Sequence, residues 1–268
     1  MRGPNRESHC LLLLLSSLGV SLAAKPNVVF FFIDDMGWTD LGFMGSKYYE
    51  SPHIDKLAQE GMVFMNAYAA APNCAPSRAC LMSGQYSPRH GVYTVANSDR
   101  GSAKHRKIIP IKNTVHLAER FVTMGEALQV GGYVTATMGK WHLGDAMRDR
   151  FTVVREVDTS GFQLPPNAGA VAGGKFKETS TGDERSGCAE WVDLLQERDP
   201  AIPFFLWLAA VDPHRPYEKQ ISTEPHPPGE VIIPPYHPDT PLVRQDYARY
   251  YDEITRLDRF VGAVLQEL

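Results

Sequence analysis

Residues 25–38, KPNVVFFFIDDMGW, decide the fold class that this sequence predicts. Val28 to Ile33 form an uninterrupted apolar run, which is typical of a strand buried on both faces of a parallel sheet. Asp34 and Asp35 follow that run directly. The stretch therefore predicts a buried parallel strand that carries two carboxylates at its carboxyl end.

Strand and helix patterns alternate along the rest of the chain, and this alternation predicts the architecture. Apolar runs predict further strands at the start of residues 133–144 and within residues 203–217. Caps and apolar periodicity predict helices over residues 52–61, 114–129, 187–198 and 242–268. We expect an α/β fold in which a mostly parallel central sheet carries helices on both faces. Residues 151–186, rich in Gly, Pro, Ser and Thr, are predicted to be a surface excursion.

Length and charge narrow the classes of protein that this chain can represent. Its 268 residues are 43% hydrophobic, which is enough apolar mass for one large α/β domain or two small ones. The formal net charge is −4. This balance argues against a nucleic-acid or membrane-surface partner held by bulk positive charge.

The first 24 residues have the pattern of an export signal. Arg2 and Arg6 precede the apolar stretch CLLLLLSSLGV (residues 10–20), which is too short to span a bilayer. Small residues in SLAA (residues 21–24) provide a cleavage site. We therefore expect a signal peptide over residues 1–24 and an exported, periplasmic or secreted protein without stable membrane insertion. The alternative is an N-terminal membrane anchor.

Three cysteines remain after removal of the leader: Cys74, Cys80 and Cys188. An odd number in an exported protein means that at least one thiol is unpaired or chemically altered. A bond between Cys74 and Cys80 is disfavoured, because six residues across a helical turn and a half set an awkward Cα separation.

The stretch PNCAPSRACLMSG (residues 72–84) places Cys74 at or before the N-terminus of a predicted helix. Pro76 suits an early helical position. Free N–H groups and the helix dipole favour an anion there and would lower the pKa of the thiol. Arg78, one turn later, can donate a forked pair of hydrogen bonds to an oxyanion. The residues alone leave a disulfide, a metal site, a thiol nucleophile and an anion-binding turn open.

Polar residues follow each of the three predicted strands. Adjacent carboxylates at Asp34 and Asp35 repel each other unless a cation lies between them, and oxygen ligands suit Ca²⁺ or Mg²⁺. A solvated turn is the plainer alternative. Lys140 and His142, in GKWHLG, share one face of an extended segment, and His214 lies in DPHRP. Sites in such folds form where strands end, so these groups predict one active site.

Several segments, in this order, resemble the sulfatase family. They are PNVVFFFIDDMGWTDLG, YYESPHIDKLAQEGMVFMNAYA, CAPSR with LMSG, GKWHLG and FFLWLAAVDPHRPY. The likeness covers nearly all of residues 26–150 and 200–268 and implies the alkaline-phosphatase-like fold. It also implies that residues 25–268 are the N-terminal catalytic domain.

The resemblance implies a role for each motif residue. Cys74 would be oxidised during export to formylglycine by a formylglycine-generating or anaerobic maturation enzyme. Asp34, Asp35 and the modified Cys74 would bind a divalent metal, with Ca²⁺ expected before Mg²⁺. Arg78 and Lys140 match the residues that hold the nucleophile and the sulfate. His142 matches the base, and His214 matches the histidine that assists the leaving group.

Two departures from the family pattern affect these expectations. Relatives are far longer, and their remaining metal ligands lie on the strand after the helix that here reaches Leu268. We therefore expect a catalytic domain truncated at its C-terminus that supplies half of the protein metal ligands. Cys80 stands where the family usually has a small residue.

The expected reaction is hydrolysis of a sulfate ester or N-sulfate on a sulfated carbohydrate or aryl sulfate. The front resembles arylsulfatases, and residues 232–268 resemble sulfamidases. Three alternatives stay open. One is a phosphonate or phosphate-ester hydrolase of the same superfamily. Another is a truncated, non-catalytic protein, and the third is a plain thiol hydrolase that pairs Cys74 with His142 or His214.

Overall fold

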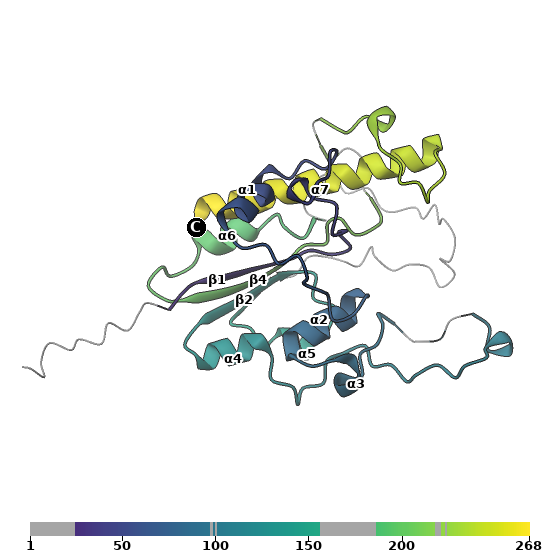
Figure 1. Cartoon of the computed structure of the whole chain (residues 1–268). Helices are drawn as coiled ribbons and strands as arrows, with labels where there is room; N and C mark the ends of the chain where they lie inside the picture. Colours follow the sequence, from purple (N-terminus) through teal and green to yellow (C-terminus); the bar gives the residue numbers. More distant parts are fainter. Residues whose placement is uncertain (1–24, 97–98, 100, 156–185, 218–220, 223) are drawn as a thin grey trace, which may run out of the picture.

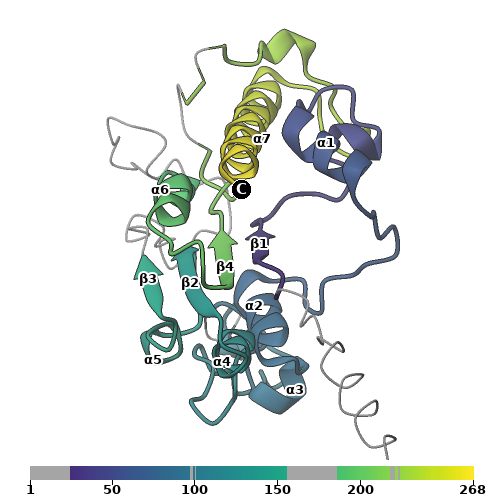
Figure 2. The same ribbon diagram turned by 90° about the vertical axis from the view of Figure 1, so that its left-hand side faces the viewer.

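A computed structural model describes residues 25–96, 99, 101–155, 186–217, 221–222 and 224–268. The predicted signal peptide and residues 156–185 of the predicted surface excursion lie outside the described residues. Four parallel strands form one sheet in the order β1-β4-β2-β3, which Figure 2 shows edge to edge. The strands are β1 (Val28–Phe32), β2 (Val134–Gly139), β3 (Val153–Arg155) and β4 (Phe204–Ala209). The predicted parallel sheet is confirmed.

Helices cover both faces of this sheet (Figure 1). One face carries α1 (Pro52–Glu60), α6 (Trp191–Gln196) and α7 (Pro241–Glu267). The opposite layer contains α2 (Cys74–Ser83), α3 (Ser87–His90), α4 (Met124–Val130) and α5 (Asp145–Arg148). Short 3-10 turns are η1 (Gly42–Met44), η2 (Ala103–His105) and η5 (Pro228–Glu230). Within the described part of the chain, no helix combines the length and apolar character needed to cross a membrane.

The central strand β4 contributes to both hydrophobic layers, because successive side chains of a strand point to opposite faces. Phe204, Leu206 and Leu208 pack in the cluster that includes residues of α6 and α7. Phe205 and Trp207 pack in the cluster that includes residues of α2. All six residues of β4 are buried, as a continuous apolar run in a parallel sheet predicts.

The predicted helix over residues 114–129 is wrong at its start. α4 begins only at Met124, because Thr123 and Glu126 form a capping box. The backbone N–H of Glu126 donates to Thr123 Oγ1 (3.2 Å), and the N–H of Thr123 donates to Glu126 Oε2 (2.8 Å). The preceding segment pairs elsewhere, since the N–H of Leu117 donates to the carbonyl of Leu143 (3.0 Å).

Ser51 and Pro52 are a typical N-cap pair in the sequence, but the N-terminus of α1 is capped from a distant part of the chain. The Ser51 side chain makes no capping bond and instead donates to Asp55 (2.8 Å). Asp258 of α7 caps the helix by accepting from the N–H groups of His53 (3.1 Å) and Ile54 (2.8 Å). The two helices are therefore joined by polar as well as apolar contacts.

Two further boundaries differ from the prediction. The helix expected over residues 187–198 is shorter, since α6 spans Trp191–Gln196. Residues 153–155, assigned to the surface excursion, form β3 and pair with β2. The final helix agrees closely with the prediction, because Thr240 caps it and Pro241 takes its first position.

β2 ends at Gly139, where the backbone of the neighbouring strand β4 approaches closely. Its φ is +92°, and a Cβ at this position would lie 2.0 Å from the carbonyl oxygen of Ala209. Only glycine accommodates this conformation without strain. Lys140 follows directly after the end of the strand, and its backbone N–H donates to the same Ala209 oxygen (2.9 Å).

Candidate active site

The predicted site residues follow the carboxyl ends of three neighbouring strands. Asp34 and Asp35 follow β1, Lys140 and His142 follow β2, and His214 follows β4. The N-terminus of α2, which carries Cys74 and Arg78, lies in the same region, since Arg78 Nη2 is 3.6 Å from Asp34 Oδ1. The ends of parallel strands are where open α/β folds form their ligand sites.

Asp34 is the centre of a buried charge cluster. Its side chain is almost inaccessible to solvent, and Lys140 Nζ forms an ion pair with its Oδ2 atom. Arg78 Nη2 lies 3.6 Å from Asp34 Oδ1. One carboxylate therefore faces two cations, which leaves the cluster with an excess of positive charge available for an anionic ligand.

Arg78 is fully buried but incompletely hydrogen bonded. Its Nη1 atom donates to the carbonyl of Lys140, and its guanidinium lies 4.8 Å from the centre of the Phe32 ring. Its Nε and Nη2 atoms have no hydrogen-bond partner among the described residues. Burial lowers the pKa of Arg78, and Asp34 opposes that shift. Buried polar atoms are rarely left unpaired, so these donors point to a ligand.

Cys74 is the first residue of α2 and is partly buried. Burial raises the pKa of its thiol, and Asp34 adds to the rise, while Lys140 and Arg78 oppose it. The predicted lowering of this pKa by the helix N-terminus is therefore wrong, because burial outweighs the nearby positive charge. Cys74, Cys80 and Cys188 form no disulfide among the described residues.

The two histidines of the site differ in their surroundings. His142 has a positive φ of 65° and is exposed to solvent. Protein packed around the ring, followed by the charges of Lys140 and Arg78, lowers the pKa of His142 to about 4. His142 is therefore neutral near pH 7 and able to accept a proton. His214 Nε2 lies 3.5 Å from Asp35 Oδ2.

The donor set at the end of β1 fits a hard divalent cation in part. Asp34 and Asp35 provide carboxylate oxygens, which Ca²⁺ and Mg²⁺ prefer. Among the described residues, no group of three His, Cys, Asp or Glu side chains is arranged to hold a metal ion. The two aspartates would therefore form one side of a coordination sphere.

Sequence reasoning missed one ion pair that supports this site. Arg256 of α7 donates from Nε and Nη2 to the two carboxylate oxygens of Asp212, both at 2.7 Å. Both side chains are buried, and Asp212 lies two residues before His214. The sequence offered one signal for this pair. Arg256 directly precedes Leu257, which is one of the apolar residues at helical spacing in the last helix.

Comparisons with known proteins agree with this geometry. The sequence model of the family described as Sulfatase matches residues 26–268. N-acetylgalactosamine-6-sulfatase of Canis lupus familiaris is 40% identical over 287 residues, which cover 96% of this chain and 50% of the relative. A sulfatase of Formosa agariphila is 46% identical over 127 residues, covering 44% of this chain and 23% of the relative.

Solved structures share the fold. Ps i-CgsB in complex with k-i-k-neocarrahexaose has a TM-score of 0.63 at 25% identity, covering 91% of this chain and 55% of that one. A phosphonate monoester hydrolase of Agrobacterium radiobacter has a TM-score of 0.58 at 20% identity. The match covers 91% of this chain and 59% of that one. The match covers 50% of the canine relative and 23% of the Formosa sulfatase, so the chain spans about half the length of its curated relatives or less. With a family match over nearly all of its residues, this chain belongs to the sulfatase family.

Proposed function

We propose that this chain contributes the nucleophile-bearing half of an exported hydrolase that acts on sulfated carbohydrates. The observation that carries the proposal is the buried Arg78, whose free donors lie beside Asp34 and near Cys74. Buried donors aimed at one place stabilise charge that develops on transferring oxygens. The sulfate group of an ester is tetrahedral and monoanionic, and it offers three non-bridging oxygens to such donors.

The raised pKa of Cys74 argues against a plain thiolate nucleophile. We propose instead that Cys74 is converted to formylglycine, which in its hydrated form supplies an oxygen nucleophile. Arg78 and Lys140 orient that group and neutralise the sulfate. Neutral His142 accepts a proton, and His214 donates one to the departing sugar oxygen.

Asp34 and Asp35 would hold the divalent metal, with Ca²⁺ preferred over Mg²⁺ for oxygen ligands of this kind. Such an ion supplies charge stabilisation at the sulfate oxygens when it is bound. Lys140, which pairs with Asp34 in this structure, would then be released toward the sulfate. Calorimetric titration of Ca²⁺ should give binding that weakens on Asp34→Asn and on Asp35→Asn.

Two measurements test the proposed function. The peptide that contains Cys74, isolated after export from a host with a maturation enzyme, should be about 18 Da lighter than the thiol form. The same preparation should hydrolyse a sulfate ester faster than the matched phosphate or phosphonate ester. An unmodified thiol in fully active protein would contradict the nucleophile, and a preference for phosphorus esters would contradict the reaction.

A sulfated glycan is the substrate class that the relatives favour. The matched N-acetylgalactosamine-6-sulfatases carry a sulfated sugar in their names, and one structural relative was solved with an oligosaccharide bound. Parallel assays with an O-sulfated and an N-sulfated amino sugar would separate the two bond types. Hydrolysis of aryl sulfates alone would contradict the glycan assignment.

A further inference from the structure

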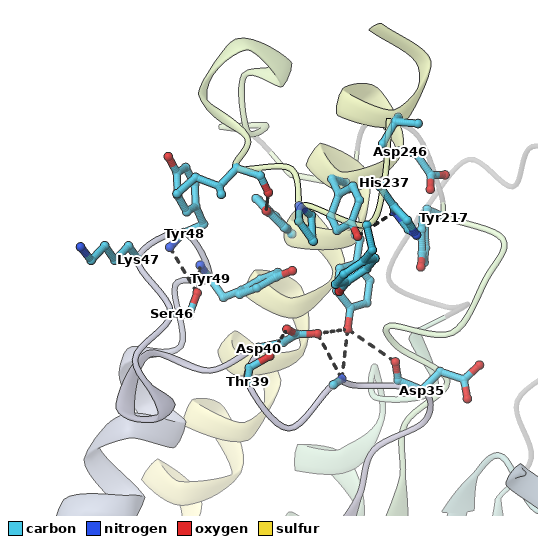
Figure 3. Close-up of a pocket in the computed structure, with 18 of the residues that line it drawn as sticks. Asp35, Thr39, Asp40, Ser46, Lys47, Tyr48, Tyr49, Tyr217, His237 and Asp246 are labelled. Carbon is cyan, nitrogen blue, oxygen red and sulfur yellow. Dashed lines mark hydrogen bonds between the residues drawn. The ribbon is translucent and has the colours of Figure 1, made fainter. Parts of the chain in front are cut away.

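A cavity of about 900 Å³ adjoins the candidate active site at Asp35 (Figure 3). It lies between the loop after β1, the first turns of α7 and the segment from Ile232 to Pro238. Seven of the chain's eleven tyrosines line it. Its size lies within the range of small-ligand sites, and its lining is far richer in one aromatic residue type than the rest of the chain.

The tyrosines fall into a packed group and an available group. Tyr49 and Tyr251 meet edge to face with ring centres 4.3 Å apart, and Tyr250 donates its hydroxyl to Asp40 (2.7 Å). These contacts build the wall. Tyr236 instead exposes 77% of its surface, and its ring lies nearly perpendicular to that of His237, with ring centres 5.0 Å apart. This lining ring is therefore largely open to a ligand.

The charges of the lining show no surplus of positive charge. Arg215 is paired with Asp246, with Nη1 2.8 Å from Oδ1, and its guanidinium lies 4.4 Å from the centre of the Tyr217 ring. The lining's other basic side chain, Lys47, stands against two further carboxylates, those of Asp35 and Asp40. A second sulfate group would meet these carboxylates without a free arginine to hold it. Carboxylate and phenol oxygens instead suit uncharged hydroxyl groups.

We propose that this cavity binds an uncharged pyranose ring, the neighbour of the sulfated ring in a glycan chain. The apolar face of a pyranose presents C–H groups, and the face of an aromatic ring carries the partial negative charge that attracts them. The shared residue Asp35 and the neighbouring His214 place this ring on the leaving-group side of the reaction. This inference rests on the proposed function and adds a preference for chains over single sugars.

Tyr236→Ala tests the proposal in the full chain. The substrates are a disaccharide with one sulfated and one uncharged ring, and 4-nitrophenyl sulfate, which has no second ring. We expect kcat/KM for the disaccharide to fall about five- to tenfold relative to the aryl sulfate, mainly through KM, for one lost aromatic contact. Tyr86→Ala removes a tyrosine that is 71% exposed outside the cavity, and it should leave the ratio as it is.

A second variant tests the charge argument. Asp246→Asn releases Arg215, so a disaccharide sulfated on both rings should gain relative to the singly sulfated one. An unchanged substrate ratio in Tyr236→Ala, or an equal change in Tyr86→Ala, would overturn the proposal.

Binding separates this proposal from the proposed function. Saturation-transfer NMR with the unsulfated disaccharide measures binding to the cavity, and it does not require hydrolysis. Binding that Tyr236→Ala weakens would support the cavity even in protein that hydrolyses no sulfate. Absence of binding in protein that hydrolyses aryl sulfates would overturn the cavity alone.

Discussion

Two buried arginines, one on each side of the sheet, have opposite hydrogen-bonding states. Arg256, in the α7 layer, forms a two-point ion pair with Asp212 at 2.7 Å for both contacts. Arg78, in the α2 layer, is equally buried, but among the described residues Nε and Nη2 make no hydrogen bond, and Nη2 has only a 3.6 Å ion pair with Asp34. A buried charge whose donors are satisfied stabilises one conformation of the chain. A buried charge with donors left over is costly for the free protein and is explained by a ligand.

Cys74→Ala gives the largest expected effect on the α2 side. Removal of the nucleophile should reduce turnover by about 10³-fold or more, as loss of a covalent catalyst does. Initial rates on a sulfate ester measure it. Cys80→Ala is the matched control, because Cys80 Sγ lies 3.4 Å from His90 Nε2 in a buried contact. A larger loss of turnover in Cys80→Ala than in Cys74→Ala would contradict the assignment of Cys74 as the nucleophile.

Arg256→Gln should chiefly destabilise the fold. Breaking a buried ion pair leaves Asp212 uncompensated, which typically costs about 3–5 kcal/mol. Urea denaturation followed by circular dichroism gives the free energy of unfolding. The double variant Arg256→Met with Asp212→Leu should recover part of this loss. If the single variant unfolds like the unsubstituted chain, the ion pair is not structural.

Arg78→Gln should produce the reverse pattern. Turnover should fall about 10²–10³-fold, the usual effect of removing one donor to a developing charge. The free energy of unfolding should change by no more than about 1.5 kcal/mol, because one hydrogen bond is lost and Asp34 keeps its ion pair with Lys140. Both quantities come from the same preparation. A stability loss equal to that of Arg256→Gln would end the distinction between the two arginines.

Thr123→Ala tests a satisfied group within the α2 layer itself. Loss of the capping box should cost about 1 kcal/mol and lower Tm by about 2–4 °C. Turnover should be unaffected, because α4 carries no site residue. Thr123→Ser keeps the hydroxyl and should restore most of the stability. A strong loss of turnover would show that the capping box affects the active site as well as the stability of the fold.

His226 provides the smallest test, on the α7 side. Its Nδ1 atom lies 2.7 Å from Asp252 Oδ1, and this hydrogen bond raises the pKa of His226 above its ordinary value of 6.5. The protonated form is favoured in the folded state, so its stabilisation is complete below pH 6.5 and is lost as pH rises through the raised pKa. The Tm difference from His226→Gln should therefore shrink as pH increases. Asp252→Asn should flatten the same dependence, and a difference that grows with pH would contradict it.

Sequence reasoning was most successful where local pattern and tertiary structure agree. The apolar runs of β1 and β4 identified the parallel sheet, because such runs are typical of its strands. The predicted full burial holds for β4 but not for β1, which ends the described sheet and is only partly buried. The sequence predicts the N-cap of this helix at Thr114 and the structure has it at Thr123, because both residues resemble caps and only tertiary contacts distinguish them. The Asp258 cap of α1 joins residues about 200 positions apart, which no local pattern encodes.

The candidate site was only partly open to prediction from the sequence. Motifs brought Asp34, Lys140 and Cys74 to one region, but their spacing does not indicate that Asp34 pairs with two cations. The sign of the Cys74 pKa shift was mistaken, because burial cannot be read from a helix cap. The tyrosine-lined cavity depends on the packing of α7 against the loop after β1 and leaves no spacing signal.

The alternating side chains of β4 affect how the protein unfolds. Because this strand supplies side chains to both apolar clusters, neither layer can open without exposing part of the other. Amide hydrogens of β4 should therefore exchange with solvent most slowly and only through cooperative global opening. The two layers should behave as one unit of stability, with β4 as its last protected segment.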